Sequence, residues 1–258
     1  MENLNQYIPR EYLALKINYL RQQLELLPKT SLQTHKVDGV QRDVIQVGRH
    51  RYFIGTDTGK KFLNLRQNRD EKERQLKIYE TIWDCHFKDY SFPECNPHKI
   101  IRTLSTSPNN HVILNKSFFD NLENDANTDY PKFKNNYFDG IYYRSSAERD
   151  IAIFYTEMGI PFKYEPKIML SGLTKPINTD FVLYIEELDT CKFHEHLGMK
   201  DSSDYLRITK VKYGNYTNAG LIPDIDILFT YDTDDFPFDI RYLSAKLNAA
   251  IFGSTLYK

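Results

Sequence analysis

The sequence predicts an α/β protein made of two parts. Residues 1–135 are expected to form an α+β module that begins with an amphipathic helix, and residues 136–258 a mixed β-sheet flanked by helices. Two observations support this division. A leucine-rich stripe with helical spacing lies near the start, and after Gly140 short apolar runs alternate with helical patterns. With 258 residues, the chain is long enough for two modest cores.

The first element is expected to be a helix from Pro9 to Leu27. Its apolar residues recur in steps of four and three, which places them on one face, and Pro28 ends it. This stripe either packs against the helix's own domain or forms the seam of a homodimer. In the rest of the first part, two short antiparallel strands are expected at residues 44–47 and 52–54, with a turn at 57–59. A charged helix at 69–87, a loop at 88–112 and a short helix at 116–122 are expected to follow.

The second part reads as helices and strands in alternation. The strands at 181–185 and 191–196 are joined by the acidic turn 186–190, which predicts a hairpin. Further strands are expected at 162–164, 167–170 and 226–231, and helices at 147–158, 203–213 and 239–252.

Charge is unevenly distributed, although the formal net charge is only −1. Residues 42–77 contain ten Lys and Arg against five Asp and Glu, a local charge of +5, whereas residues 221–240 contain six Asp and no Lys or Arg. This asymmetry suits a protein that holds phosphates in one region and metal in another, although solvated helix faces would look the same. The candidate nucleic-acid-binding residues are Arg49, Arg51, Lys60, Lys61, Arg66 and Arg144, with Tyr52, Phe53 and Phe62 as aromatic partners.

The three cysteines form no Cys-x-x-Cys pair, and the first residues have no basic or apolar signal-peptide regions. The sequence also lacks an apolar run of about 18 residues. We therefore expect a cytoplasmic, reducing location and no membrane contact.

Four residues of the second part have the types needed for phosphodiester hydrolysis: Glu148, Asp180, Glu195 and Lys212. Asp180 begins one predicted strand and Glu195 lies near the end of the next, so a hairpin would bring the two carboxylates to one side of the sheet. Paired carboxylates suit a hard cation such as Mg²⁺, which can activate water, and a nearby ammonium can stabilise charge on the phosphate. Glu148 could complete the metal shell.

From about residue 140 onward the chain resembles the PD-(D/E)xK nuclease superfamily, in the branch related to transposon-encoded endonucleases. The matching segments, in order, are YYRSSAERDIA (142–152), GIPFKYEP (159–166), NTDF (178–181), FHEHLGM (193–199), KYGNYTNAGL (212–221) and LFTYD (228–232).

The resemblance implies a restriction-endonuclease-like fold and a DNA endonuclease that uses Mg²⁺ or Mn²⁺. Glu148, Asp180 and Glu195 would be the metal-binding acids. It also implies a mobile-element or defence setting, in which a partner protein supplies targeting or recombination. Two positions depart from the simplest motif: Thr179 replaces Pro, and Leu197 replaces Lys. A lysine on the following helix can substitute in this superfamily, and Lys212 fits that position better than Lys210.

Other interpretations remain open for these residues. Ser145 and Glu148 match a helix capping box. His194 and His196 could bind zinc, but strand alternation places them on the face opposite Glu195. Two further groups of residues are alternative metal sites. Pro223-Asp224 with Asp226 resembles the Pro-Asp part of the nuclease motif, and Cys85, His86, Cys95 and His98 have the ligand types of a structural zinc site.

Three alternatives to a DNA endonuclease follow. The chain could be a catalytically inactive nucleic-acid-binding protein, favoured by the missing strand lysine. It could be an assembly subunit that docks or dimerises through the leucine stripe. The substrate could also be RNA, because the hydrolytic chemistry is the same.

Overall fold

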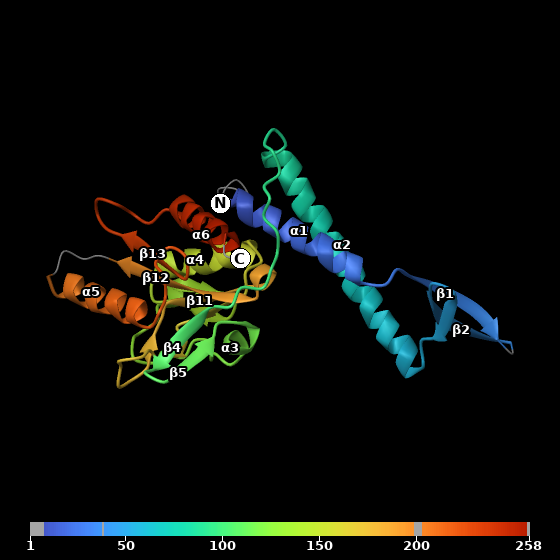
Figure 1. Cartoon of the computed structure of the whole chain (residues 1–258), viewed down its shortest axis with the longest axis horizontal. Helices are drawn as coiled ribbons and strands as arrows, with labels where there is room; N and C mark the ends of the chain where they lie inside the picture. Colours follow the sequence, from blue (N-terminus) through green and yellow to red (C-terminus); the bar gives the residue numbers. More distant parts are fainter. Residues whose placement is uncertain (1–7, 38, 199–202, 257–258) are drawn as a thin grey trace. The chain divides into compact units, whose positions relative to one another are not determined.

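The computed structural model describes residues 8–37, 39–198 and 203–256. The chain divides into two compact units (Figure 1). The N-terminal unit comprises Leu13–Asn96. The C-terminal unit comprises residues 1–12 together with Pro97–Lys258. The architecture is mixed α and β, as the sequence predicts.

The N-terminal unit contains most of α1 (Arg10–Leu26), which coincides with the predicted first helix. Leu13, Ile17 and Leu20 of its apolar stripe are buried. Three antiparallel strands follow in the order β1-β2-β3, at Thr30–Val37, Val40–Val47 and His50–Phe53. The two predicted strands overlap β2 and β3, whereas the polar strand β1 was not expected.

Helix α2 (Asp57–His86) begins well before the predicted start at residue 69. The turn expected at residues 57–59 is wrong, because Thr56 caps the helix by accepting a hydrogen bond from Gly59 N at 3.1 Å. Gly59 is buried within the first turn, where a β-carbon would overlap the carbonyl oxygen of Phe53. This glycine therefore marks close packing of backbone on backbone rather than a reverse turn.

The C-terminal unit is built on a four-stranded sheet in the order β13-β12-β11-β8. Strand β11 (Phe181–Ile185) pairs antiparallel with β8 (Phe162–Tyr164) on one side and with β12 (Thr190–Gly198) on the other, and the β11–β12 pair is the predicted hairpin. Strand β13 (Ile227–Asp232) pairs parallel to β12, and the intervening chain includes helix α5 (Ser203–Asn218).

Helices cover both faces of this sheet. Helices α4 (Ser146–Glu157) and α6 (Ile240–Thr255) lie over one face, and α3 (Lys116–Asp120) lies on the other (Figure 1). Strand alternation divides the side chains accordingly. Phe181 and His194 contact Tyr155 of α4, whereas Val182 and Phe193 belong to the core on the opposite side.

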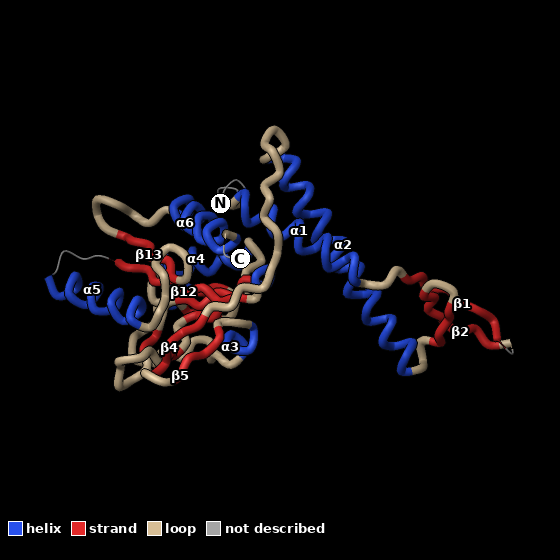
Figure 2. The backbone as a smooth tube through the Cα atoms, viewed as in Figure 1, coloured by secondary structure: helices blue, strands red, loops and turns tan. Residues whose placement is uncertain are grey.

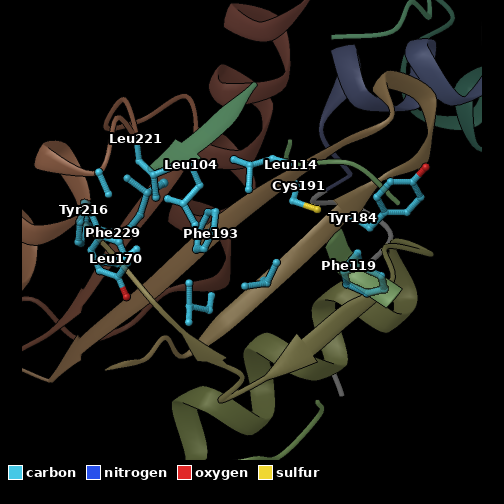
Figure 3. Packing of buried hydrophobic residues seen from close by; sticks show 14 of the residues in the cluster. Leu104, Leu114, Phe119, Leu170, Tyr184, Cys191, Phe193, Tyr216, Leu221 and Phe229 are labelled. Atoms are coloured by element: carbon cyan, nitrogen blue, oxygen red, sulfur yellow. The ribbon is translucent and has the colours of Figure 1, made fainter. Parts of the chain in front are cut away.

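The domain boundary expected near residue 136 lies inside the C-terminal unit. The segment predicted as a loop over residues 88–112 contains a hairpin, β4 (Thr103–Ser107) and β5 (Asn110–Ile113), which Figure 2 shows as two strands. Leu104 and Leu114 pack into the same core as Phe193 (Figure 3). Residues 97–135 therefore supply part of the core beneath the sheet, which is why they cannot belong to a separate module.

Two small antiparallel hairpins complete the unit. One pairs β6 (Tyr137–Phe138) with β7 (Ile141–Tyr142), and the other pairs β9 (Lys167–Ile168) with β10 (Ile177–Asn178). In the parts of the chain that the structure describes, no helix is both long and apolar enough to cross a membrane.

Candidate active site

The first turn of α4 places Glu148 in the interior. Ser145 caps the helix, and its hydroxyl accepts a hydrogen bond from Glu148 N at 3.1 Å, so the predicted cap exists. The Glu148 carboxylate does not turn back to Ser145 N, as a capping box would require. Its Oε2 instead accepts from the Arg144 N–H at 3.1 Å and the Tyr164 hydroxyl at 2.6 Å. Glu148 is therefore held in a polar cluster rather than used only as a cap.

The β11–β12 hairpin brings Asp180 and Glu195 together. Phe181 pairs with His194, so continuing this register by one residue places Asp180 opposite Glu195 on the same face. Asp180 Oδ2 accepts from the backbone N–H of His196 at 2.7 Å, which fixes the carboxylate against β12. Glu195 is fully buried, where a lone carboxylate would be costly.

Helix α5 supplies the partners of Glu195. The Lys212 ammonium donates to Glu195 Oε2, and the Tyr216 hydroxyl donates to Oε1. The two donors are four residues apart and thus on one helix face. Lys210 is exposed, so Lys212 is the lysine that adjoins the carboxylates.

Arg144 links the remaining acids. Its Nη2 lies 3.0 Å from Asp180 Oδ1 and 3.2 Å from Glu148 Oε1, while its Nε lies 2.7 Å from Glu165 Oε1. The sequence suggested Arg144 as a phosphate-binding residue, but here the guanidinium is engaged by three carboxylates.

Glu165 was not singled out from the sequence. It is 1% exposed and its backbone is left-handed, with φ of 45°. Asn127 Nδ2 donates to it at 2.8 Å. This backbone conformation is energetically costly for a glutamate, which indicates that the surrounding structure holds the Glu165 side chain at this position. The available signal was an acidic residue between two apolar strands, directly before Pro166.

Four buried acids and two cations, Arg144 and Lys212, determine the electrostatics of this cluster. Burial, with Asp180 close by, raises the pKa of Glu148 to about 7 and that of Glu195 to about 7. Burial alone would also raise the pKa of Asp180, but Lys212, Arg144 and the His196 N–H together hold it below its usual value. Burial would lower the pKa of Lys212, but Glu195 and Asp180 raise it, so this lysine stays charged.

The donor chemistry fits a hard divalent cation, because Glu148, Asp180 and Glu195 offer carboxylate oxygens. Among the residues described, however, no three His, Cys, Asp or Glu side chains are arranged as a ready metal site. The carboxylate oxygens are instead engaged by the cations Arg144 and Lys212 and by tyrosine hydroxyls. Binding of a metal ion would require it to replace part of these contacts.

Residues of the alternative metal-site patterns are engaged in other contacts. His194 bonds to Tyr155 and Thr230 at 2.7 and 2.8 Å, on the face opposite Glu195, as strand alternation predicts. Asp226 forms an ion pair with Arg102, and Asp224 forms one with Lys246 at 2.7 Å. The two carboxylates of the literal Pro-Asp pattern are thus held in ion pairs.

The basic candidates of the N-terminal unit lie on two elements, the β2–β3 hairpin and helix α2. Arg49 and Arg51 are exposed near the β2–β3 turn. Lys60 and Lys61 are exposed on α2, where they line a groove with Asn64 and Asn68. Arg66 is half-buried and donates to Thr30 O at 3.3 Å, which gives it a packing role.

Comparison with known protein families, curated proteins and solved structures finds no match to this chain.

Proposed function

We propose that the chain is a metal-dependent phosphodiesterase, a DNA endonuclease of the PD-(D/E)xK type. The observation that supports this most is the convergence of Glu148, Asp180 and Glu195 with Lys212, from four separate segments, in one buried cluster. Buried titratable groups with strongly shifted pKa values are typical of active sites.

The order of elements adds support. Helix α4 is followed by the antiparallel strands β8, β11 and β12, then by α5, and then by β13 parallel to β12. A mixed sheet of this kind, with helices on both faces, agrees with the restriction-endonuclease-like core that the sequence resemblance implies.

In this proposal each side chain has a distinct role. The carboxylates of Asp180 and Glu195, with Glu148, would hold Mg²⁺ or Mn²⁺. The bound cation would lower the pKa of a water molecule and neutralise charge on the phosphate. Lys212 remains protonated, so it would donate hydrogen bonds to the phosphate rather than accept a proton. Tyr216 orients Glu195 by donating to its second oxygen.

Cleavage of supercoiled plasmid and single-stranded DNA tests this function. Wild type should nick DNA with Mg²⁺ or Mn²⁺ but not with EDTA, and Glu195→Ala should be inactive while folded. Lys212→Gln should lose activity on the order of 100-fold or more, as expected for loss of one preorganised donor. The matched variant Lys210→Gln should retain it. Equal losses in the two lysine variants would argue against the role of Lys212.

A catalytically inactive nucleic-acid-binding or assembly subunit is the second candidate. One observation favours it: no ready metal group exists among the described residues, and the acids are already paired with cations. Under this alternative, folded wild type would bind DNA equally well with or without divalent metal and would not cleave it.

A further inference from the structure

Four large aromatic side chains are exposed within a short segment beside the candidate active site. Tyr130, Phe133, Tyr137 and Tyr142 are 61%, 58%, 54% and 46% exposed. We call them the aromatic rim. Soluble proteins seldom expose several large apolar side chains in one place unless the surface binds something.

Backbone hydrogen bonds hold the rim together. Phe133 N donates to Tyr143 O at 3.4 Å, and Tyr143 N donates to Asn136 O at 2.9 Å. Tyr137 pairs with Tyr142 across β6 and β7, and their ring centroids lie 5.0 Å apart. Two rings therefore stand side by side on one face of a hairpin, and Phe133 is tied to the same backbone.

The rim adjoins the carboxylate cluster through two residues. The Arg144 guanidinium lies over the Tyr130 ring, 5.7 Å from its centroid, and also contacts Asp180. Tyr143 is buried and packs on Tyr164, whose hydroxyl donates to Glu148. Because Tyr142 and Tyr143 alternate along the strand, one faces outward while the other supports the active-site side.

The chemistry of the rim favours nucleobases over an aliphatic protein surface. Between residues 130 and 142 the chain has no Leu, Val or Met, and Ile141 is only half-exposed. Lys132 and Lys134 lie between the aromatic residues in the sequence. Lys132 pairs with Asp125, whereas exposed Lys134 forms no ion pair with a carboxylate among the residues that the structure describes. Aromatic rings interleaved with donors of this kind suit stacked bases and the phosphates between them.

We propose that the aromatic rim stacks unpaired bases of a nucleic-acid strand whose backbone passes the Arg144 carboxylate cluster. The preferred substrate would then contain a single-stranded segment, such as a flap, gap or frayed end. This inference rests on the proposed function, because a nucleic acid is the expected ligand of the rim only if the neighbouring cluster is a phosphodiesterase site.

Binding measurements in EDTA test the rim separately from cleavage. Labelled single-stranded DNA, single-stranded RNA, a blunt duplex and a duplex with a single-stranded flap would be titrated with full-length Glu195→Gln protein, and fluorescence anisotropy recorded. The rim variant Tyr137→Ala/Tyr142→Ala should bind single-stranded and flapped DNA about tenfold or more weakly. Its affinity for blunt duplex should change little.

Two matched variants separate stacking from disturbance of the fold. Tyr137→Phe/Tyr142→Phe keeps both rings and should bind as wild type does. Phe252→Ala removes a ring that is 50% exposed on α6 and should also leave binding unchanged. Should the alanine variant not fold, photocrosslinking of an iodouracil-containing strand to the parent protein should map to residues 130–142.

Several results would overturn the inference. These are an absence of single-strand binding by the parent protein, equal losses on duplex and single strands, equal losses in the phenylalanine variant, or crosslinks confined to other segments. Rim-dependent binding together with no cleavage by wild type would instead support the rim while refuting the hydrolase. Similar rim-dependent affinity for RNA and DNA would support base stacking and show that the rim does not discriminate between ribose and deoxyribose.

Discussion

At the scale of single residues, Arg144 forms ion pairs with several acids of the candidate active site at once. Its guanidinium contacts Glu148, Asp180 and Glu165, all of which are buried. A buried charge that loses its partner is strongly destabilising, because desolvation is no longer offset. Arg144 therefore acts as an internal cation that neutralises part of the negative charge of these acids.

This role predicts how Arg144→Met should behave. In EDTA at neutral pH the variant should lose about 3–5 kcal/mol of stability, the usual cost of breaking a buried ion pair. Millimolar Mg²⁺ should raise its Tm more than that of wild type, because the cation can replace the missing guanidinium. Thermal unfolding with and without Mg²⁺ measures both effects. Arg149→Met, which removes an ion pair to half-exposed Asp150, should cost less than about 1 kcal/mol.

Lys192 is a second buried charge, on the α6 side of the sheet. Its Nζ donates to Ile225 O and Ser254 Oγ, each at 2.6 Å, and burial lowers its pKa from 10.5 to about 8. Between pH 8 and 10.5 the folded state thus binds fewer protons than the unfolded state, so the free energy of unfolding should rise with pH. The total rise from this group is about 3 kcal/mol.

Urea unfolding across this range checks the sign. The stability of wild type relative to Lys192→Met should increase from pH 7.5 to pH 10. Lys175→Met, at an exposed position, should follow wild type across the range. A wild-type advantage that shrinks as pH rises would show that Lys192 is not held with a lowered pKa.

At the scale of elements, the junction between β3 and α2 is packed closely around Gly59. Gly59→Ala would place a β-carbon against the backbone of Phe53 and Ile54, which cannot move without shifting the helix start. We expect a loss of about 1–3 kcal/mol or more. Gly55→Ala is the control, since a β-carbon there meets nothing. Hydrogen exchange of β3 and the first turns of α2 should accelerate only in Gly59→Ala.

The elements also show what sequence patterns can and cannot predict. The helices α1, α4 and α6 followed from apolar residues at helical spacing. The hairpin β11–β12 followed from two apolar runs joined by an acidic turn, and its strands are buried on both faces. The hairpin β4–β5 did not, since its short strands are rich in Ser, Thr and Asn and only Leu104 is buried. Its packing is decided by tertiary contacts that local composition does not reveal.

The same limit applies to the candidate site. Asp180 and Glu195 could be placed together because hairpin register is a local property. Lys212 required the family resemblance, since no strand register relates helix α5 to the two acids. Glu165 was missed although it directly precedes Pro166, because its ion pair with Arg144 joins segments on either side of helix α4 and strand β8.

At the scale of the whole molecule, the two compact units predict which fragments fold. A fragment beginning at Pro97 retains the hairpin β4–β5 and α3, whereas one beginning at residue 136 lacks Leu104, Leu114 and Phe119 of the core. Loss of each large core side chain costs about 2–5 kcal/mol, and three exceed the stability of many domains. Circular dichroism and NMR should show a folded 97–258 fragment and an unfolded 136–258 fragment. Equal folding of both would place the boundary near residue 136 after all.

The central claim is that the clustered acids hold a divalent metal for hydrolysis, and Mn²⁺ binding measured by calorimetry tests it most directly. Wild type should bind Mn²⁺ with measurable heat, and Asp180→Asn and Glu195→Gln should each abolish or greatly weaken binding while remaining folded. Asp224→Asn, which removes a carboxylate paired with Lys246, should bind as wild type does. Folded wild type that binds no Mn²⁺, or binding that survives in both Asp180→Asn and Glu195→Gln, would contradict the claim.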